Sequence, residues 1–166
     1  GTAFGGKLRI HPVAAILARI QLRELDKRNT EGTAQIKRLN ERITQLPGLS
    51  EQYVRPDTTR VFYSKNLMFI DEAKAGASRS ALVKALQAEG VDVAEYGWKL
   101  LHTYPIFAED KWWRHMPVLT DKVPGCDEAN KQAIALPYFT SDQPELVEQY
   151  AAAFEKVWAH RESLSA

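Results

Sequence analysis

Residues 5–26 read GGKLRIHPVAAILARIQLRELD, and this stretch decides how the fold begins. Proline is tolerated at the first position of a helix, and the residue before a proline prefers an extended backbone, so His11-Pro12 predicts a helix start. Apolar residues then recur at spacings near three and four, as they do along one face of a helix: Val13, Ile16, Leu17, Ile20 and then Leu25. Charged residues fill the other face. The stretch therefore predicts an amphipathic helix.

A second apolar stripe follows the first and ends at Pro47-Gly48. Its members are also spaced three or four residues apart: Ile36, Leu39, Ile43 and Leu46. The polar, glycine-containing stretch 29–32 separates the two stripes. This pattern predicts either two helices or one long, kinked helix.

The middle of the chain has the composition of strands and one short helix. Residues 60–71 are rich in β-branched, aromatic and aliphatic side chains, which predicts one strand, or two with a bend. Ser78 can cap a helix, and Gly90 stands where a left-handed C-terminal cap is expected. Residues 91–93 alternate as in a short strand.

The last third begins with a long irregular segment, residues 96–126, of the kind that often builds sites. A buried strand is expected at residues 133–136. Asp142 and Glu145 have the spacing of a capping box, which predicts a final helix. The whole pattern predicts an α+β fold with a small mixed or antiparallel sheet, packed with the N-terminal helix or helix pair and the C-terminal helix.

Composition bounds the class of protein. At 166 residues with 45% hydrophobic side chains, the chain suits one domain spanning residues 1–166. It contains no apolar run long enough to cross a membrane and no signal peptide, and Cys126 is its single cysteine, so a cytoplasmic location is expected.

Charge is unevenly distributed along the chain. The net charge is only +1, yet residues 1–46 hold nine Lys and Arg against four Asp and Glu. These cations lie on a helical stretch without aromatic residues, which favours a solvated face and argues against a nucleic-acid partner. No catalytic motif and no metal site can be recognised, so we predict neither a catalytic residue nor a metal ligand in this chain.

The segment Gly5–Arg9 carries the most chemistry. Glycines let a backbone approach a ligand, Arg9 presents a fork suited to phosphate oxygens, and a helix N-terminus adds partial positive charge. These features predict an oxyanion site. The alternative is a chain segment with two solvated cations, Lys7 and Arg9.

The run from Phe4 to Ala15, continued by Gln21–Asp26 and Asn29, resembles the segment with which the DegT/StrS family of PLP-dependent sugar aminotransferases begins its small C-terminal domain. Weaker matches follow in the family's order, and they extend over almost the whole chain: Arg79 with Leu82, Leu86 and Gly90; Tyr96 with Leu100, Leu101, His102 and Pro105; Met116-Pro117; and Ala135-Leu136-Pro137.

The resemblance implies roles for particular residues. Lys7 and Arg9 match the pair that approaches the cofactor phosphate of the partner subunit in a family dimer. His102 and Tyr104 match the substrate side, and Trp112 and Trp113 are candidate surfaces on which a sugar ring stacks.

In such enzymes the lysine that forms the Schiff base with PLP comes from a large domain that precedes this segment. We therefore expect a piece of an aminotransferase acting on a keto-sugar or keto-cyclitol. It would contribute phosphate contacts, substrate-side walls and dimer surface, without binding PLP or catalysing alone. The alternative is a stand-alone binding or oligomerisation module derived from that domain.

Overall fold

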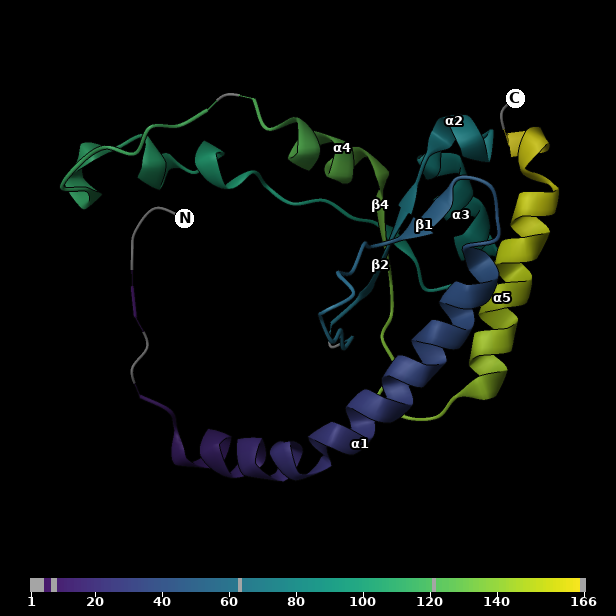
Figure 1. The fold of residues 1–166 in the computed structure, drawn as a ribbon, viewed down its shortest axis with the longest axis horizontal. Helices are drawn as coiled ribbons and strands as arrows, with labels where there is room; N and C mark the ends of the chain where they lie inside the picture. The colour runs from purple at the N-terminus through teal and green to yellow at the C-terminus, as the bar shows by residue number, and fades with distance from the viewer. Residues whose placement is uncertain (1–4, 7–8, 63, 121, 165–166) are drawn as a thin grey trace.

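The structure is a computed structural model that describes residues 5–6, 9–62, 64–120 and 122–164. It has the expected α+β architecture, with a four-stranded sheet, a long N-terminal helix and a C-terminal helix (Figure 1). The main elements follow in chain order: α1 (Pro12–Ile43), β1 (Leu49–Glu51), β2 (Asn66–Ile70), α2 (Glu72–Ala75), α3 (Arg79–Ala88), β3 (Ala94–Glu95), α4 (Pro124–Gln132), β4 (Ala133–Leu136) and α5 (Pro144–Ala159). Within the described residues, no helix is long and apolar enough to cross a membrane.

Helix α1 is one continuous helix of 32 residues, so the alternative of a helix pair is wrong. The polar stretch 29–32 stays helical, and Figure 1 shows the helix changing direction along its length. The His11 ring caps its start, because Nδ1 accepts a hydrogen bond from the Val13 amide at 3.3 Å. Only the second half of α1 enters the core, where Ile36, Leu39 and Ile43 are buried.

The sheet is antiparallel throughout, with strand order β1-β2-β4-β3. The expected strand at residues 133–136 is confirmed as β4, and all four of its residues are buried between neighbours on both sides. This position explains why β4 reads as a continuous apolar run.

Two expected strands have different bounds. The strand expected over residues 60–71 is restricted to β2. Its first residue, Asn66, pairs with Leu136 of β4, and the residue after Leu136 is Pro137, which has no amide hydrogen to continue the ladder. The prediction of a strand at residues 91–93 is wrong. Val91 and Val93 are buried in the core, and pairing with β4 begins only at Ala94.

Helix α3 has both caps that the sequence predicts. Ser78 Oγ accepts a hydrogen bond from the Ala81 amide at 3.2 Å. At the other end, Gly90 adopts a φ of 87°, and the amides of Gly90 and Val91 donate to Gln87 and Leu86 at 3.0 Å each. This is the Schellman arrangement, which satisfies carbonyls at the end of the helix.

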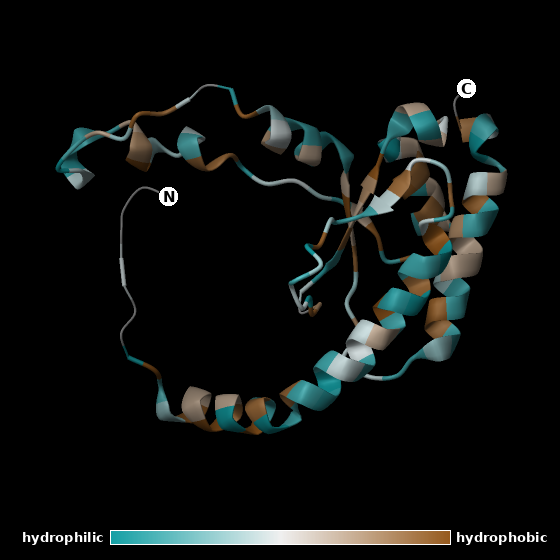
Figure 2. Ribbon diagram, viewed as in Figure 1, coloured by the Kyte–Doolittle hydropathy of each residue, from teal (hydrophilic) through white to brown (hydrophobic). Residues whose placement is uncertain are grey.

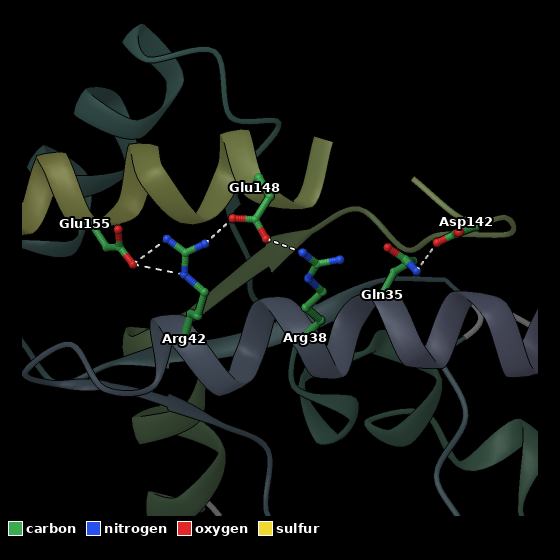
Figure 3. A network of polar contacts seen from close by, with 6 residues as sticks. All are labelled: Gln35, Arg38, Arg42, Asp142, Glu148 and Glu155. Atoms are coloured by element: carbon green, nitrogen blue, oxygen red, sulfur yellow. Dashed lines mark hydrogen bonds and ion pairs between the residues drawn. The ribbon is translucent and has the colours of Figure 1, made fainter. Parts of the chain in front are cut away.

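The final helix is confirmed as α5, but the capping box is wrong. The N-cap residue is Gln143, which makes no capping hydrogen bond through its side chain. Asp142 accepts instead from the side-chain amide of Gln35 on α1. Helices α1 and α5 lie side by side, and Figure 3 shows the polar contacts that join them along one edge.

Candidate functional site

The first candidate region precedes α1. Lys7 lies outside the described residues. Arg9 is exposed, and within the described part of the chain its side chain has no hydrogen bond or ion pair. The first turn of α1 carries no acidic residue, so the partial positive charge of the helix N-terminus is not neutralised there. This end of the molecule can therefore receive an anion.

The second candidate region is a projection that we call the arm, residues 96–120 and 122–123. Figure 1 shows it leaving the sheet after β3 and returning through α4 to β4. Short 3-10 turns give it local structure, at Leu101–Thr103, Pro105–Phe107 and Asp110–Trp112. The irregular segment expected over residues 96–126 is confirmed for residues 96–120 and 122–123. Helix α4, which the sequence analysis missed, begins at Pro124.

The base of the arm is fixed by Asn130, a residue of α4. Its side-chain amide oxygen accepts from the Trp98 amide at 2.7 Å, and its nitrogen donates to the Trp98 carbonyl at 2.8 Å. Next to this clamp, the Tyr96 amide donates to the Ala133 carbonyl at 2.9 Å. The outgoing and returning legs of the arm are thus held together where they leave the sheet.

Arg79, at the start of α3, ties this base to the core. Its guanidinium donates to the carbonyls of Asn130 at 2.7 Å and Ala133 at 3.1 Å. The same group forms an ion pair with Glu95 of β3 at 2.8 Å, and the Arg79 side chain is only 17% exposed. Residue order along the chain gave no sign that Arg79, Asn130 and Glu95 act together.

His102 and Tyr104 are both half-buried within the arm. His102 lines a hollow of about 320 Å³ whose walls are mainly apolar and include Phe107 and Cys126. The Tyr104 ring lies beneath the ammonium group of Lys99, with the nitrogen 4.6 Å from the ring centroid. This geometry suits a cation–π contact.

The two adjacent tryptophans differ in their surroundings. The Trp113 ring stacks on Phe107 at a centroid distance of 5.4 Å, and its indole nitrogen donates to the Ile106 carbonyl at 2.8 Å. Trp113 therefore helps to hold the arm together. Trp112 is more exposed, with the Lys111 ammonium 5.5 Å from its ring centroid.

The structure thus places four of the predicted site residues on one element and Arg9 elsewhere, and Lys7 lies outside the described residues. His102, Tyr104, Trp112 and Trp113 all belong to the arm, whereas Arg9 precedes α1. Figure 1 shows the arm and the first half of α1 as separate projections from the same side of the core. Among the described residues, no three His, Cys, Asp or Glu side chains gather into a metal-binding group.

Comparison with known proteins identifies the lineage. Residues 1–155 match the DegT/DnrJ/EryC1/StrS aminotransferase family. The chain belongs to this family. No curated protein matches the sequence significantly.

Solved structures agree with the family assignment at the level of the fold. DesV from S. venezuelae, solved with a ketimine intermediate, superposes with a TM-score of 0.71 at 20% identity over 90% of this chain and 37% of its own. An aminotransferase from Psychrobacter cryohalolentis gives 0.73 at 17% identity over 95% of this chain and 41% of its own. DesI, solved in the presence of its TDP-sugar product, gives 0.67 at 17% identity over 91% and 36%.

This chain therefore spans well under half the length of these aminotransferases. The family match over residues 1–155 includes α1, the sheet and the arm, and the arm carries the predicted substrate-side residues.

Proposed function

We propose that this chain is the C-terminal small domain of a PLP-dependent aminotransferase that transfers an amino group to a keto-sugar or keto-cyclitol. The family match over residues 1–155 carries the proposal, together with the short share of the solved aminotransferases that the chain spans. The product named for DesI, a TDP-sugar, supports a sugar as the acceptor class. On this account the chain works in the cytoplasm, as part of a dimer, and only together with a large domain.

Exposed apolar surface on α1 supports the need for a larger assembly. The apolar stripe predicted from the sequence lies on the first half of α1 and faces away from the core: Val13, Ile16, Leu17, Ile20 and Leu25 are all at least 44% exposed. Two neighbouring apolar residues are exposed as well, Ile10 before the helix and Leu22 on it. Figure 2 shows the hydrophobic positions along these turns. An exposed apolar stripe of this length is unusual on the surface of a monomer and is typical of an interface. We assign it to the large domain and the dimer partner.

The phosphate side of the cofactor site falls at the start of α1. PLP, when bound, supplies the electron sink for amino transfer. The unpaired guanidinium of Arg9 and the unneutralised helix N-terminus suit a phosphate group, and Lys7 would add a second cation. In our proposal these residues hold the phosphate of the partner subunit's cofactor.

The Schiff-base lysine is assigned to the large domain. Three described lysines with an acidic neighbour, Lys74, Lys111 and Lys156, sit in surface ion pairs with side chains at least 58% exposed. A lysine that condenses with PLP needs a site that excludes water and lowers its pKa. Residues of the arm, including His102 and Tyr104, are proposed to line the substrate side.

The test uses the full aminotransferase that contains this chain. Replacing Arg9 by glutamine should lower PLP retention about tenfold or more, because one charge-assisted contact to phosphate is lost. Lys84→Gln, an exposed change on α3, is the matched control and should leave retention unchanged. Unchanged retention in Arg9→Gln would remove the phosphate assignment.

The alternative, a stand-alone oligomerisation module, rests on the same exposed stripe of α1. The two accounts predict different coding sequences upstream of residue 1. A preceding domain with a Schiff-base lysine supports the aminotransferase, and a start codon directly before Gly1 supports the module.

A further inference from the structure

Asn130 is held from two sides at the base of the arm. Its side chain accepts a hydrogen bond from the Trp98 amide at 2.7 Å and donates one to the Trp98 carbonyl at 2.8 Å. Its own backbone carbonyl accepts from the Arg79 guanidinium at 2.7 Å. Asn130 therefore connects the start of α3 in the core with the outgoing leg of the arm.

The end of α4 explains why the Asn130 carbonyl is available to Arg79. In a longer helix the Ile134 amide would donate to this carbonyl, but α4 ends at Gln132 and Ile134 belongs to β4. A cation at this end of a helix also meets the negative pole of the helix dipole. Because the Arg79 side chain is only 17% exposed and pairs with Glu95 at 2.8 Å, the last turn of α4 is anchored to the core.

The side chain of Asn130 is suited to hold the chain direction at Trp98. A neutral primary amide supplies an acceptor and a donor side by side, which is what the amide and the carbonyl of one extended residue require. The neighbouring hydrogen bond from the Tyr96 amide to the Ala133 carbonyl, at 2.9 Å, fixes the chain two residues earlier. These contacts set the direction in which the arm leaves the sheet.

The residues proposed for the substrate side follow directly after this clamp. His102 is four positions beyond Trp98 and belongs to the turn Leu101–Thr103. Lys99, the residue after Trp98, places its ammonium 4.6 Å from the centroid of the Tyr104 ring. Figure 1 shows the arm as a long projection from the sheet, so a small change of direction at its base displaces the residues along it.

We propose that Asn130 is a positioning residue for amino transfer to the keto-sugar or keto-cyclitol. It sets the direction of the arm, and through the arm the position of His102 and Tyr104, without itself touching the substrate. The inference rests on the proposed function, in which the arm lines the substrate side. An amino-acid donor is smaller than a sugar, so the donor depends less on a wall that lies away from the reacting carbon.

The test uses the full aminotransferase that contains this chain. The donor is glutamate or glutamine, and the acceptor is the one used best from a panel of free keto-hexoses, TDP-linked keto-hexoses and keto-inositol. In ping-pong kinetics, kcat/KM for each substrate reports its own half-reaction. In Asn130→Ala, kcat/KM for the acceptor should fall about tenfold or more, because misplaced positioning groups cost rate, whereas kcat/KM for the donor should stay within about twofold.

Asn130→Asp tests the clamp at nearly constant side-chain shape. Its carboxylate can still accept from the Trp98 amide but turns a second oxygen toward the Trp98 carbonyl, so kcat/KM for the acceptor should fall about tenfold here too. Lys131→Ala, an exposed change in the same turn of α4, is the matched control and should leave both values unchanged. Alanine favours helix, so α4 should remain formed in both alanine variants.

Hydrogen exchange on the same enzymes gives a second measurement that does not depend on turnover. Exchange at residues 96–104 should be faster in Asn130→Ala and Asn130→Asp than in Lys131→Ala, and exchange within α5 should be the same in all three. This pattern would show that the substitutions release the arm and leave the core intact.

Two kinetic results would overturn the positioning role and leave the proposed function standing. The value of kcat/KM for the acceptor could be unchanged in both Asn130 variants, or kcat/KM could fall by the same factor for acceptor and donor, as it does when less enzyme is folded. If the unaltered enzyme aminates no acceptor of the panel, the proposed function fails and the positioning role fails with it.

Discussion

Asn40 of α1 and Asn66 of β2 exchange hydrogen bonds through their side-chain amides inside the core. Asn66 Nδ2 donates to Asn40 Oδ1 at 2.7 Å, and Asn40 Nδ2 donates to Asn66 Oδ1 at 3.3 Å. Asn40 Nδ2 also reaches Glu51 at 3.0 Å on the neighbouring strand. Both asparagines are at most 3% exposed, so the pair fixes the helix against one register of the sheet.

Replacing Asn66 by alanine should destabilise the fold by about 1–3 kcal/mol, because the side-chain oxygen Oδ1 of Asn40 is left buried without its partner. Urea denaturation measures the change. Gln45→Ala, an exposed amide just after α1, should change stability by no more than about 0.5 kcal/mol. Equal effects of the two substitutions would contradict a structural role for the asparagine pair.

The ion-pair network of Figure 3 predicts how stability depends on pH. Glu148 of α5 pairs with Arg38 at 2.7 Å and with Arg42, which also contacts Glu155 at 2.8 Å. Burial raises the pKa of Glu148, but hydrogen bonds from Arg38 and Arg42 outweigh burial and hold the pKa below its ordinary value of 4.5.

A carboxylate with a depressed pKa in the folded state contributes stability above its unfolded pKa and loses it as pH falls through the folded pKa. Melting temperatures of the unaltered chain should therefore fall more steeply below pH 4.5 than those of Glu148→Gln. Glu41→Gln, an exposed change on α1, is the control, and its melting temperature should fall below pH 4.5 as steeply as that of the unaltered chain. If the melting temperatures of Glu148→Gln and of the unaltered chain fell equally steeply below pH 4.5, this contribution of Glu148 would be excluded.

Two helical glycines should respond to alanine with opposite signs. A Cβ at Gly32 of α1 would lie 2.0 Å from the Phe139 carbonyl oxygen, whereas at Gly125 of α4 it would meet nothing within 4 Å. Alanine favours helix by up to about 1 kcal/mol. Gly125→Ala should raise the free energy of unfolding by several tenths of a kcal/mol. Gly32→Ala should lower it by about 2 kcal/mol, because the added methyl group meets the Phe139 carbonyl. A stabilising Gly32→Ala would show that α1 does not approach this loop so closely.

Arg79 should control how firmly the arm is attached. Removing its guanidinium takes this donor from the carbonyl of Asn130 and the carboxylate of Glu95, and leaves the Ala133 carbonyl with the Tyr96 amide alone. In Arg79→Lys the single ammonium cannot reproduce the fork, so hydrogen exchange at residues 96–98 should accelerate at least tenfold. Exchange within α5 should stay unchanged, and a uniform acceleration through the core would contradict the local role.

The main elements could be predicted because their signals are local. The stripes that begin at Val13 and at Ile36 each follow helical spacing, and residues 133–136 form an apolar run. Ser78 and Gly90 have the chemistry of caps. The burial of the two α1 stripes could not be predicted. Periodicity shows that a helix has an apolar face, but it does not show whether that face packs within the chain or outside it.

Long-range pairing explains the other differences. The start of β2 depends on Pro137, and the hydrogen bonding of Asp142 depends on Gln35, which is 107 positions away in sequence. The base of the arm joins Arg79 to Asn130 across 51 positions. Among the candidate site residues, Arg9 was marked by its chemistry and its place before a helix, whereas His102 and Tyr104 were found through family resemblance.

The most direct test of the account asks whether this chain carries the lysine chemistry of its family. The 166-residue chain is incubated with PLP, reduced with borohydride and digested, and its peptides are analysed by mass spectrometry. Our account predicts only scattered, substoichiometric pyridoxyl labelling of exposed lysines. Stoichiometric labelling of one lysine, with an imine absorbance before reduction, would contradict the claim that a separate large domain supplies the catalytic lysine.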